Sequence, residues 1–133
     1  MELPDKVQDE IINKLKEERY IDEDRFIRSF INDKLQFNKW GRKKIELALF
    51  QKRLPRESID RIFMEYPEAD LSHALPELLE KKWPSITGKS LYEKRSKLIR
   101  YALGRGFAMK EINHCLDELL KNKPNDEDTF YIE

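Results

Sequence analysis

Residues 44–63 read KIELALFQKRLPRESIDRIF, and residues 97–116 read KLIRYALGRGFAMKEINHCL. The second stretch repeats the first at a constant shift of 53 residues, which pairs Leu54 with Phe107. Repetition at a fixed interval is typical of stacked helical units, each of which buries one face against the next. We therefore expect an all-α protein, an elongated tandem array of three-helix repeats that works through a long surface.

The composition agrees with thin helical units. Hydrophobic residues and charged residues each make up 39% of the 133-residue chain, and there are only four glycines. No apolar stretch approaches the ~18 residues of a membrane span, and the start of the chain lacks the apolar segment of a signal peptide. These features predict a cytoplasmic protein.

The charges alternate in bands along a chain whose net charge is zero. Residues 34–56 and 81–110 are basic, whereas residues 57–80 and 111–133 are acidic. A net charge of zero argues against a protein that coats nucleic acid by electrostatics alone. Two basic bands at equivalent places in two repeats favour a specific partner that meets both, although charged faces of this kind also occur on ordinary helical surfaces.

The apolar periodicity divides the chain into units. We expect residues 1–22 to be the last helix of an incomplete first repeat, because Leu3-Pro4 parallels Leu54-Pro55. Residues 23–67 and 68–123 are predicted as the second and third three-helix repeats, and residues 124–133 as a polar tail. A helix break is expected between the first unit and the acidic segment 22–24.

Local signals predict several turns and helix ends. Residues 39–42 should form a turn with Gly41 as its flexible point. The helix around Pro76 either begins there or is kinked there, and the sequence leaves both open. Ser90 and Glu93 form a capping-box pattern. The predicted core includes the side chains Phe26, Phe30, Ile45, Leu49, Ile59 and Phe63.

The residue inventory argues against an enzyme. We predict no catalytic residues, no bound cofactor and no metal site, since two histidines and one cysteine do not make a zinc site without carboxylates. Cys115 aligns with the apolar Ile62, so it is interpreted as a buried structural cysteine. The GRG sequence at 104–106 follows a helix, which favours a helix C-cap over a phosphate loop.

Two segments carry a resemblance to a known family. YIDEDRF at 20–26 and KWGRKKI at 39–45 stand in the order and spacing found in the RecX family of bacterial recombination regulators, which this chain strongly resembles. The residues that match the family motif are Tyr20, Asp22, Arg25, Phe26, Trp40, Gly41 and Arg42.

The resemblance implies a fold and a function. RecX proteins form an elongated array of three three-helix repeats, of which about two helices are absent at the front of this chain. They bind the RecA recombinase filament on single-stranded DNA and inhibit its ATPase, strand-exchange and coprotease activities. The extended array suggests a monomer, and the composition predicts no membrane partner. The alternative is a direct DNA-binding helical module, with single- or double-stranded DNA as the partner.

The candidate partner-binding residues form two basic clusters, which lie in the two basic bands except for Arg25 and Arg28 just ahead of the first band. They are Arg25, Arg28, Lys39, Arg42, Lys43, Lys44, Lys52, Arg53, Lys94, Arg95, Lys97, Arg100 and Arg105, and they would meet RecA or DNA phosphate. Trp40 either stacks on the partner or packs against its own repeat.

Overall fold

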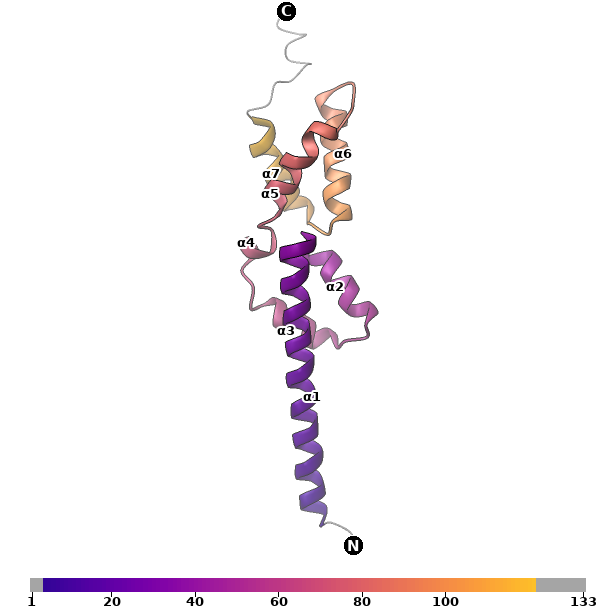
Figure 1. The fold of residues 1–133 in the computed structure, drawn as a ribbon, viewed down its shortest axis with the longest axis vertical. Coiled ribbons are helices and arrows are strands. Elements are labelled where there is room, and N and C mark those ends of the chain that lie inside the picture. Colours follow the sequence, from indigo (N-terminus) through magenta and orange to yellow (C-terminus); the bar gives the residue numbers. More distant parts are fainter. Residues whose placement is uncertain (1–3, 122–133) are drawn as a thin grey trace, which may run out of the picture.

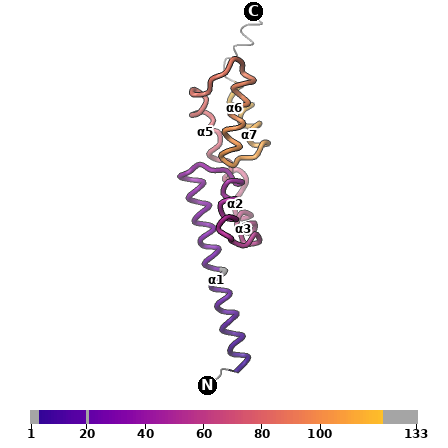
Figure 2. The backbone as a smooth tube through the Cα atoms, turned by 90° about the vertical axis from the view of Figure 1, so that its right-hand side faces the viewer, coloured from indigo at the N-terminus to yellow at the C-terminus, as the bar shows by residue number. Residues whose placement is uncertain are grey.

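The computed structural model describes residues 4–121, apart from the side chain of Tyr20, and shows a long, narrow molecule built from helices (Figures 1 and 2). The elements in order are α1 (Asp5–Asp33), a π-helical turn (Lys34–Asn38), α2 (Arg42–Gln51), α3 (Arg56–Phe63), α4 (Glu68–Leu71), α5 (Leu75–Lys82), a 3₁₀ turn (Trp83–Ser85), α6 (Leu91–Gly104) and α7 (Met109–Lys121). The predicted polar tail, 124–133, lies outside the described residues.

Helix α1 is continuous over 29 residues, so the expected break before the acidic segment 22–24 is wrong. No glycine or proline occurs between Asp5 and Asp33 to interrupt the helix. Arg19 donates to Glu23 at 3.2 Å, an (i, i+4) pair that spans the expected break. The first half of α1 extends beyond the other helices at one end of the molecule (Figure 1).

The first hydrophobic core joins the second half of α1 to α2 and α3. Its fully buried side chains are Ile27, Ile31, Ile45, Leu49, Ile59, Ile62 and Phe63, with Leu71 of α4 at the edge. The prediction is confirmed for Ile45, Leu49, Ile59 and Phe63. It is wrong for Phe26, which is 45% exposed, and Phe30 is only partly buried against this core.

The second core joins α5, α6 and α7. Its buried members are Leu75, Leu79, Leu98, Ala102, Phe107, Ile112, Leu116 and Leu119. Helix α5 begins at Leu75, so Pro76 lies in its first turn, where proline is tolerated, and no kink is needed. At the start of α6, the Ser90 hydroxyl accepts from the Glu93 amide at 3.2 Å, and the Glu93 carboxylate accepts from the Lys89 amide at 2.9 Å.

Two ion pairs connect α1 to the α3 region on the solvent side of the first core. Arg61 donates to both carboxylate oxygens of Asp24, at 2.7 and 3.0 Å. Arg28 makes the same two-point contact with Glu65, at 2.8 and 2.7 Å. These hydrogen bonds lower the pKa of the Asp24 and Glu65 carboxyls.

The lowered pKa values predict a loss of stability in acid. The folded protein takes up these two protons less readily than the unfolded chain, so their contribution is present above the ordinary values of 3.8 and 4.5 and disappears as pH falls through the lowered ones. We expect the melting temperature to fall as the pH is lowered below about 4.5. The double variant Asp24→Asn/Glu65→Gln, melted over the same pH series, should show a shallower fall; an unchanged slope would contradict this assignment.

The two cores meet at a joint, which we define as the contact of the α2 start (Gly41–Lys44) with the α6–α7 turn (Arg105–Phe107). The Gly41 amide donates to the Arg105 carbonyl at 2.7 Å, and the Lys43 amide donates to the Gly106 carbonyl at 3.0 Å. Carbonyls of the second unit therefore satisfy amides at the start of a first-unit helix, which would otherwise lack partners.

Gly41 is required at the joint for space. A Cβ at this position would lie 2.4 Å from the Gly106 carbonyl carbon and 2.6 Å from the Phe107 nitrogen, both backbone atoms. The expected flexible glycine is therefore wrong: Gly41 has an extended φ of −87°. The left-handed residue of this turn is Lys39, with φ of 56°.

Candidate partner-binding surface

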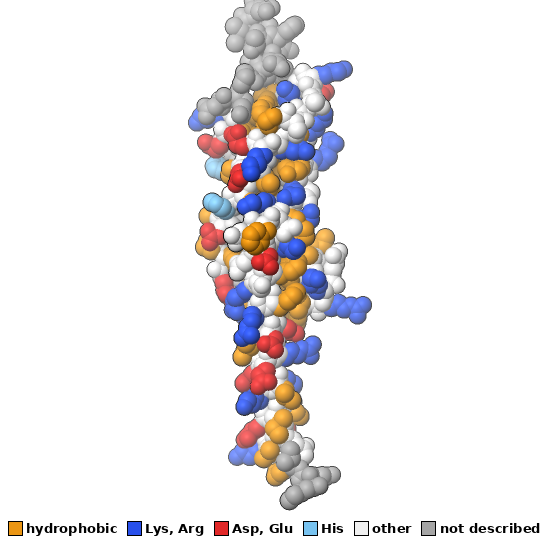
Figure 3. All heavy atoms as spheres, in the orientation of Figure 1, with side chains coloured by type: hydrophobic (Ala, Val, Ile, Leu, Met, Phe, Trp, Pro, Cys, Tyr) orange, Lys and Arg blue, Asp and Glu red, His pale blue; other side chains and the backbone are white. Residues whose placement is uncertain are grey.

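The two basic helices, α2 and α6, follow one another along the long axis in both views (Figures 1 and 2). Lys and Arg side chains gather along the side of the molecule where these helices lie (Figure 3). The joint connects this surface across the two units, so its two halves are held at one separation. The basic bands of the sequence thus occupy neighbouring parts of one elongated surface.

Aromatic rings and lysines alternate on the first unit in a group that we call the cation–aromatic row: Lys44, Trp40, Lys34, Phe30 and Lys52. The ammonium groups of Lys44 and Lys34 lie 4.6 and 4.8 Å from the Trp40 ring centroid. Those of Lys34 and Lys52 lie 5.2 and 5.6 Å from the Phe30 centroid. Cations within about 6 Å of a ring are attracted to its face, so the row holds three positive charges in place.

Trp40 packs within its own unit, as one of the two sequence interpretations proposed. Its ring is half-buried against the first core, and two lysines already lie on it. The second unit has similar pairs: Lys94 lies 5.6 Å from the Trp83 centroid, and Lys82 lies 5.0 Å from the Tyr101 centroid.

The thirteen predicted partner-binding residues divide into two groups. Eight have intramolecular contacts: Arg28 with Glu65, Arg42 with Glu46, Lys44 and Lys52 with aromatic rings, Lys94 with Trp83, Arg95 with Asp117, Lys97 with the Thr87 carbonyl, and Arg105 with the Asn38 carbonyl. Arg25, Lys39, Lys43, Arg53 and Arg100 make no side-chain hydrogen bond, ion pair or ring contact within residues 4–121. Arg25, Lys43, Arg53 and Arg100 are also exposed, which leaves them available to a partner.

Arg105 has a structural position at the joint. Its Nη2 donates to the Asn38 carbonyl at 2.5 Å, and its Nε is buried without a hydrogen-bond partner. The side chain thus links the α6–α7 turn to the end of the π-helical turn. Arg105 therefore has a structural role in the contact between the units and is a poor candidate for partner binding.

Sequence reasoning missed several contributors. Lys34 and Lys82 were not among the candidates, although both hold ring contacts on this surface. The spacing of these lysines relative to nearby aromatic residues could have predicted the ring contacts. The pairs Arg61–Asp24 and Arg28–Glu65 were harder to predict from the sequence, because each joins residues 37 positions apart that only the fold brings together.

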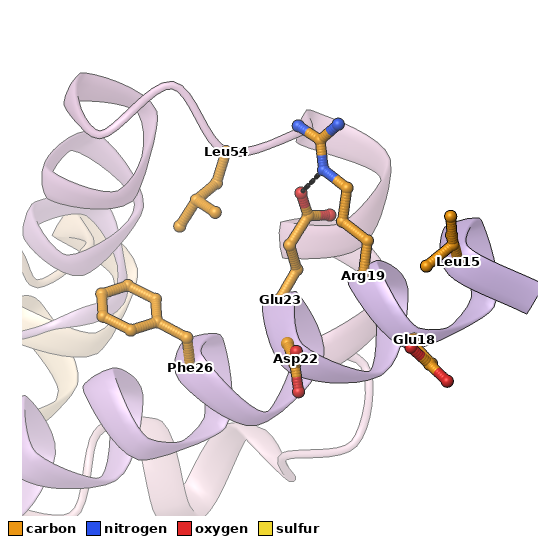
Figure 4. Close-up of a pocket in the computed structure, with 7 residues that line it drawn as sticks. All are labelled: Leu15, Glu18, Arg19, Asp22, Glu23, Phe26 and Leu54. Carbon is orange, nitrogen blue, oxygen red and sulfur yellow. Dashed lines mark hydrogen bonds and ion pairs between the residues drawn. The ribbon is translucent and has the colours of Figure 1, made fainter.

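A second feature is an open hollow of about 490 Å³ between α1 and the α2–α3 turn. Its lining residues are Leu15, Glu18, Arg19, Asp22, Glu23, Phe26 and Leu54 (Figure 4). Phe26 of α1 and Leu54 of the turn point into the same space, and the Arg19–Glu23 pair forms one wall. The motif residues Asp22 and Phe26 therefore belong to this hollow, whereas Trp40, Gly41 and Arg42 lie at the start of α2.

The remaining features to consider are metal-binding groups, the cysteine and membrane-spanning helices. Across residues 4–121, no group of three or more His, Cys, Asp or Glu residues is placed to hold a metal ion. Cys115 is half-buried, and burial followed by the nearby Glu111 charge raises the pKa of its thiol, which keeps it protonated. None of the described helices has the length and apolar character to cross a membrane.

Comparison with protein families gives two matches in the order of the units. Residues 22–61 match the model of the RecX second three-helix domain, and residues 74–116 match that of the RecX third three-helix domain. The first match covers α1 from Asp22 onward, α2, and α3 up to Arg61, and the second covers α5–α7 up to Leu116.

The curated relatives also carry the RecX name. The chain is 29% identical to "Regulatory protein RecX" of Chlorobium phaeobacteroides over 86% of this chain and 73% of that protein. It is 30% identical to the protein of the same name in Bacillus mycoides, over 89% of this chain and 43% of the relative, and 27% identical to that of Clostridium acetobutylicum, over 89% and 56%. The chain thus spans only about half of the latter two relatives. No solved structure matches it significantly.

Proposed function

Because the chain belongs to the RecX family of regulatory proteins, we propose that it binds the RecA recombinase filament on single-stranded DNA and inhibits RecA's ATPase, strand-exchange and coprotease activities. It acts as a monomer by binding, without catalysis of its own. Residues 1–22, 23–67 and 68–123 serve as parts of three successive repeats.

The observation that best supports this proposal is the joint between the two units. A filament presents the same protomer surface at regular intervals, and a binder with two basic helices at one fixed separation can contact more than one protomer. Simultaneous contact raises affinity without any single strong site. The cation–aromatic row and the exposed Lys43 and Arg100 supply positive charge for acidic protomer surface or DNA phosphate.

The first test is DNA-stimulated ATP hydrolysis by the cognate RecA, titrated with this protein. Inhibition well below one copy per RecA would support a filament regulator. No inhibition at stoichiometric ratios would contradict the proposal. The direct DNA-binding alternative is tested in parallel by binding to single-stranded DNA without RecA, where a steep dependence on salt is its expected signature.

The double charge reversal Lys43→Glu/Arg100→Glu should weaken this inhibition about tenfold, equivalent to about 1.4 kcal/mol shared between two exposed charges. Within residues 4–121 neither side chain makes a hydrogen bond, ion pair or ring contact, so the melting temperature should stay within about 2 °C of the parent. Arg42 and Lys44 are less suitable, because one pairs with Glu46 and the other with Trp40.

Lys6→Glu/Lys14→Glu is the matched control for this reversal. It makes the same change in net charge on exposed positions of the first half of α1, away from α2 and α6. Equal weakening by both variants would mean that overall charge, and not this surface, governs the inhibition.

A further inference from the structure

Helix α6 carries an exposed apolar stripe among its basic side chains. Tyr92, Ile99 and Leu103 are separated by seven and four residues, so they lie on one face of the helix. Tyr92 is 76% exposed, Leu103 is 43% exposed, and Ile99 is only partly buried against the second core. Apolar side chains that stay uncovered together in this way mark an interaction surface.

The charges around this stripe are almost all positive. Helix α6 contains one acidic residue, Glu93, and four basic residues: Lys94, Arg95, Lys97 and Arg100. Another lysine, Lys89, precedes the helix. Lys89 and Arg100 are exposed, and neither side chain makes a hydrogen bond, ion pair or ring contact within residues 4–121. The α6 face therefore combines apolar contact area with two cations that have no counterion in the described part of the chain.

The end of α7 brings the following chain to this face. Helices α6 and α7 are joined by the short turn 105–108 and run in opposite directions (Figure 1). Arg95 Nη2 lies 3.0 Å from an Asp117 carboxylate oxygen, and Asp117 is one turn before Lys121, the last residue of α7. The chain therefore leaves α7 close to the start of α6.

The sequence after Lys121 is complementary to the α6 face in both charge and apolar content. Residues 126–133 read DEDTFYIE, with three consecutive carboxylates followed, after one threonine, by three consecutive apolar side chains. These residues lie outside the described part of the chain. Carboxylates pair with Lys and Arg, and aromatic rings such as those of Phe130 and Tyr131 attract cations as well as apolar groups. The acidic and apolar parts of this segment thus suit the two kinds of side chain on α6.

The connection is long enough to cover the stripe. Phe130 follows Lys121 by nine positions, and an extended chain spans about 3.3 Å per residue, or about 30 Å in all. Helix α6 rises about 17 Å from Tyr92 to Leu103, at about 1.5 Å per residue. A tether of this length holds the segment at an effective concentration of about 1 mM or more. A contact that is weak between separate molecules is therefore occupied within one chain.

We infer that residues 126–132 dock on the α6 face of the same molecule. The carboxylates of residues 126–128 lie beside Lys89 at the start of α6. The Phe130–Ile132 side chains lie on Ile99 and Leu103, with an aromatic ring against the Arg100 guanidinium.

This docking has a consequence that rests on the proposed function. Arg100 belongs both to the docking face and to the surface assigned to the partner, so the acidic segment competes with the RecA filament for α6. The chain thereby regulates its own access to the filament. Binding to RecA requires the segment to leave the helix.

The test attaches a nitroxide spin label to the variant Thr129→Cys, in a Cys115→Ala background that leaves one thiol. Nuclear magnetic resonance then compares the amide signals of residues 96–103 with the label oxidised and reduced. We expect the oxidised label to remove at least about half of their intensity, because the tethered contact is occupied most of the time. Salt at about 1 M, which screens charges beyond about 3 Å, should restore part of it.

Variants on both sides of the contact separate docking from mere attachment near α6. The neutral segment, Asp126→Asn/Glu127→Gln/Asp128→Asn, should restore most of the signal. The altered face, Arg100→Glu/Leu103→Ser, should do the same. Signals weakened equally in the parent and in these two variants would overturn the docking.

Lys43→Glu/Leu47→Ser is the matched control on α2. It makes the same change in net charge and in apolar area at two exposed positions of the other basic helix. We expect it to leave the weakened signals of residues 96–103 unchanged. Restoration of the signal by this control would mean that overall charge holds the segment, and would overturn its assignment to α6.

A mixture of two preparations identifies the molecule that the segment occupies. Isotope-labelled chains without a spin label are combined with spin-labelled chains without isotope. We expect full signals from residues 96–103. Signals as weak as those of the singly prepared protein would place the segment on a second copy, and would overturn docking within one molecule.

The consequence for RecA is measured separately, by inhibition of ATP hydrolysis. The neutral segment should inhibit at about threefold lower concentration than the parent, since an open form populated at about one third weakens the apparent affinity by that factor. Equal inhibition by both proteins would overturn the competition. Absence of inhibition by either protein would overturn the proposed function, whereas the docking is decided without RecA by the spin label.

Discussion

Replacing Phe63 with alanine is expected to lower the free energy of unfolding by about 3–5 kcal/mol, the usual cost of removing a fully buried aromatic ring. Phe63 is 1% exposed and belongs to the core that joins α1, α2 and α3. Its ring lies 6.5 Å from that of Tyr66, and the Arg42 guanidinium lies 4.8 Å from its centroid. The substitution therefore leaves a cavity and removes a support of Arg42.

Urea denaturation followed by circular dichroism measures this loss. Phe37→Ala is the matched control, because Phe37 is 72% exposed in the π-helical turn and the same atoms are removed. Its effect should stay within about 0.5 kcal/mol. If the two variants unfold at similar denaturant concentrations, Phe63 does not carry the packing assigned to it.

Gly41→Ala should open the joint while leaving both hydrophobic cores assembled. The new methyl group would meet backbone atoms at 2.4–2.6 Å, and backbone cannot rotate aside as a side chain can. The cost is about 1–3 kcal/mol from overpacking, together with the hydrogen bonds of the Gly41 and Lys43 amides, about 1 kcal/mol each. Calorimetry should show the single melting transition broaden or split, and the Lys43 amide should exchange faster.

Gly104→Ala, at the last residue of α6 and next to the joint, provides the control. No heavy atom lies within 4 Å of a Cβ added there, so the variant should melt within about 2 °C of the parent or slightly above it. The pair also bears on function. If the separation of α2 and α6 matters for the RecA filament, Gly41→Ala should reduce inhibition and Gly104→Ala should not. Identical melting and identical exchange in the two variants would contradict the assigned role of Gly41.

The joint also explains why the role predicted for Gly41 from the sequence was wrong. Trp-Gly-Arg suggested a flexible turn, because glycine often provides unusual backbone angles. The unusual angle belongs to Lys39, and Gly41 is needed because residues 65 positions later approach its backbone. A single sequence carries no direct sign of such an approach.

Apolar periodicity and local capping signals in the sequence determined the helical class, the capped start of α6 at Ser90, and four of the six predicted core residues. These features are local: apolar spacing sets which face of a helix is buried, and Ser90, Pro55 and Gly106 mark helix ends or turns through their own backbone preferences. The repeat at 53 residues also predicted two equivalent units. Helices and turns can be predicted from the residues of a short stretch, and the repeat can be predicted by comparing two such stretches.

Only the tertiary structure decided which parts of these faces are covered. Phe26 has the spacing of a core residue, yet it is 45% exposed beside the hollow between α1 and the α2–α3 turn. Phe107 is buried, although its equivalent in the first unit, Leu54, is only partly buried. The same applies to the charges: Arg28 and Arg61 pair with carboxylates 37 residues away, while Lys43 and Arg100 have no ion pair within the described part of the chain. Burial and pairing depend on neighbours distant in sequence, and those neighbours are fixed by packing between helices and not by the pattern within any one of them.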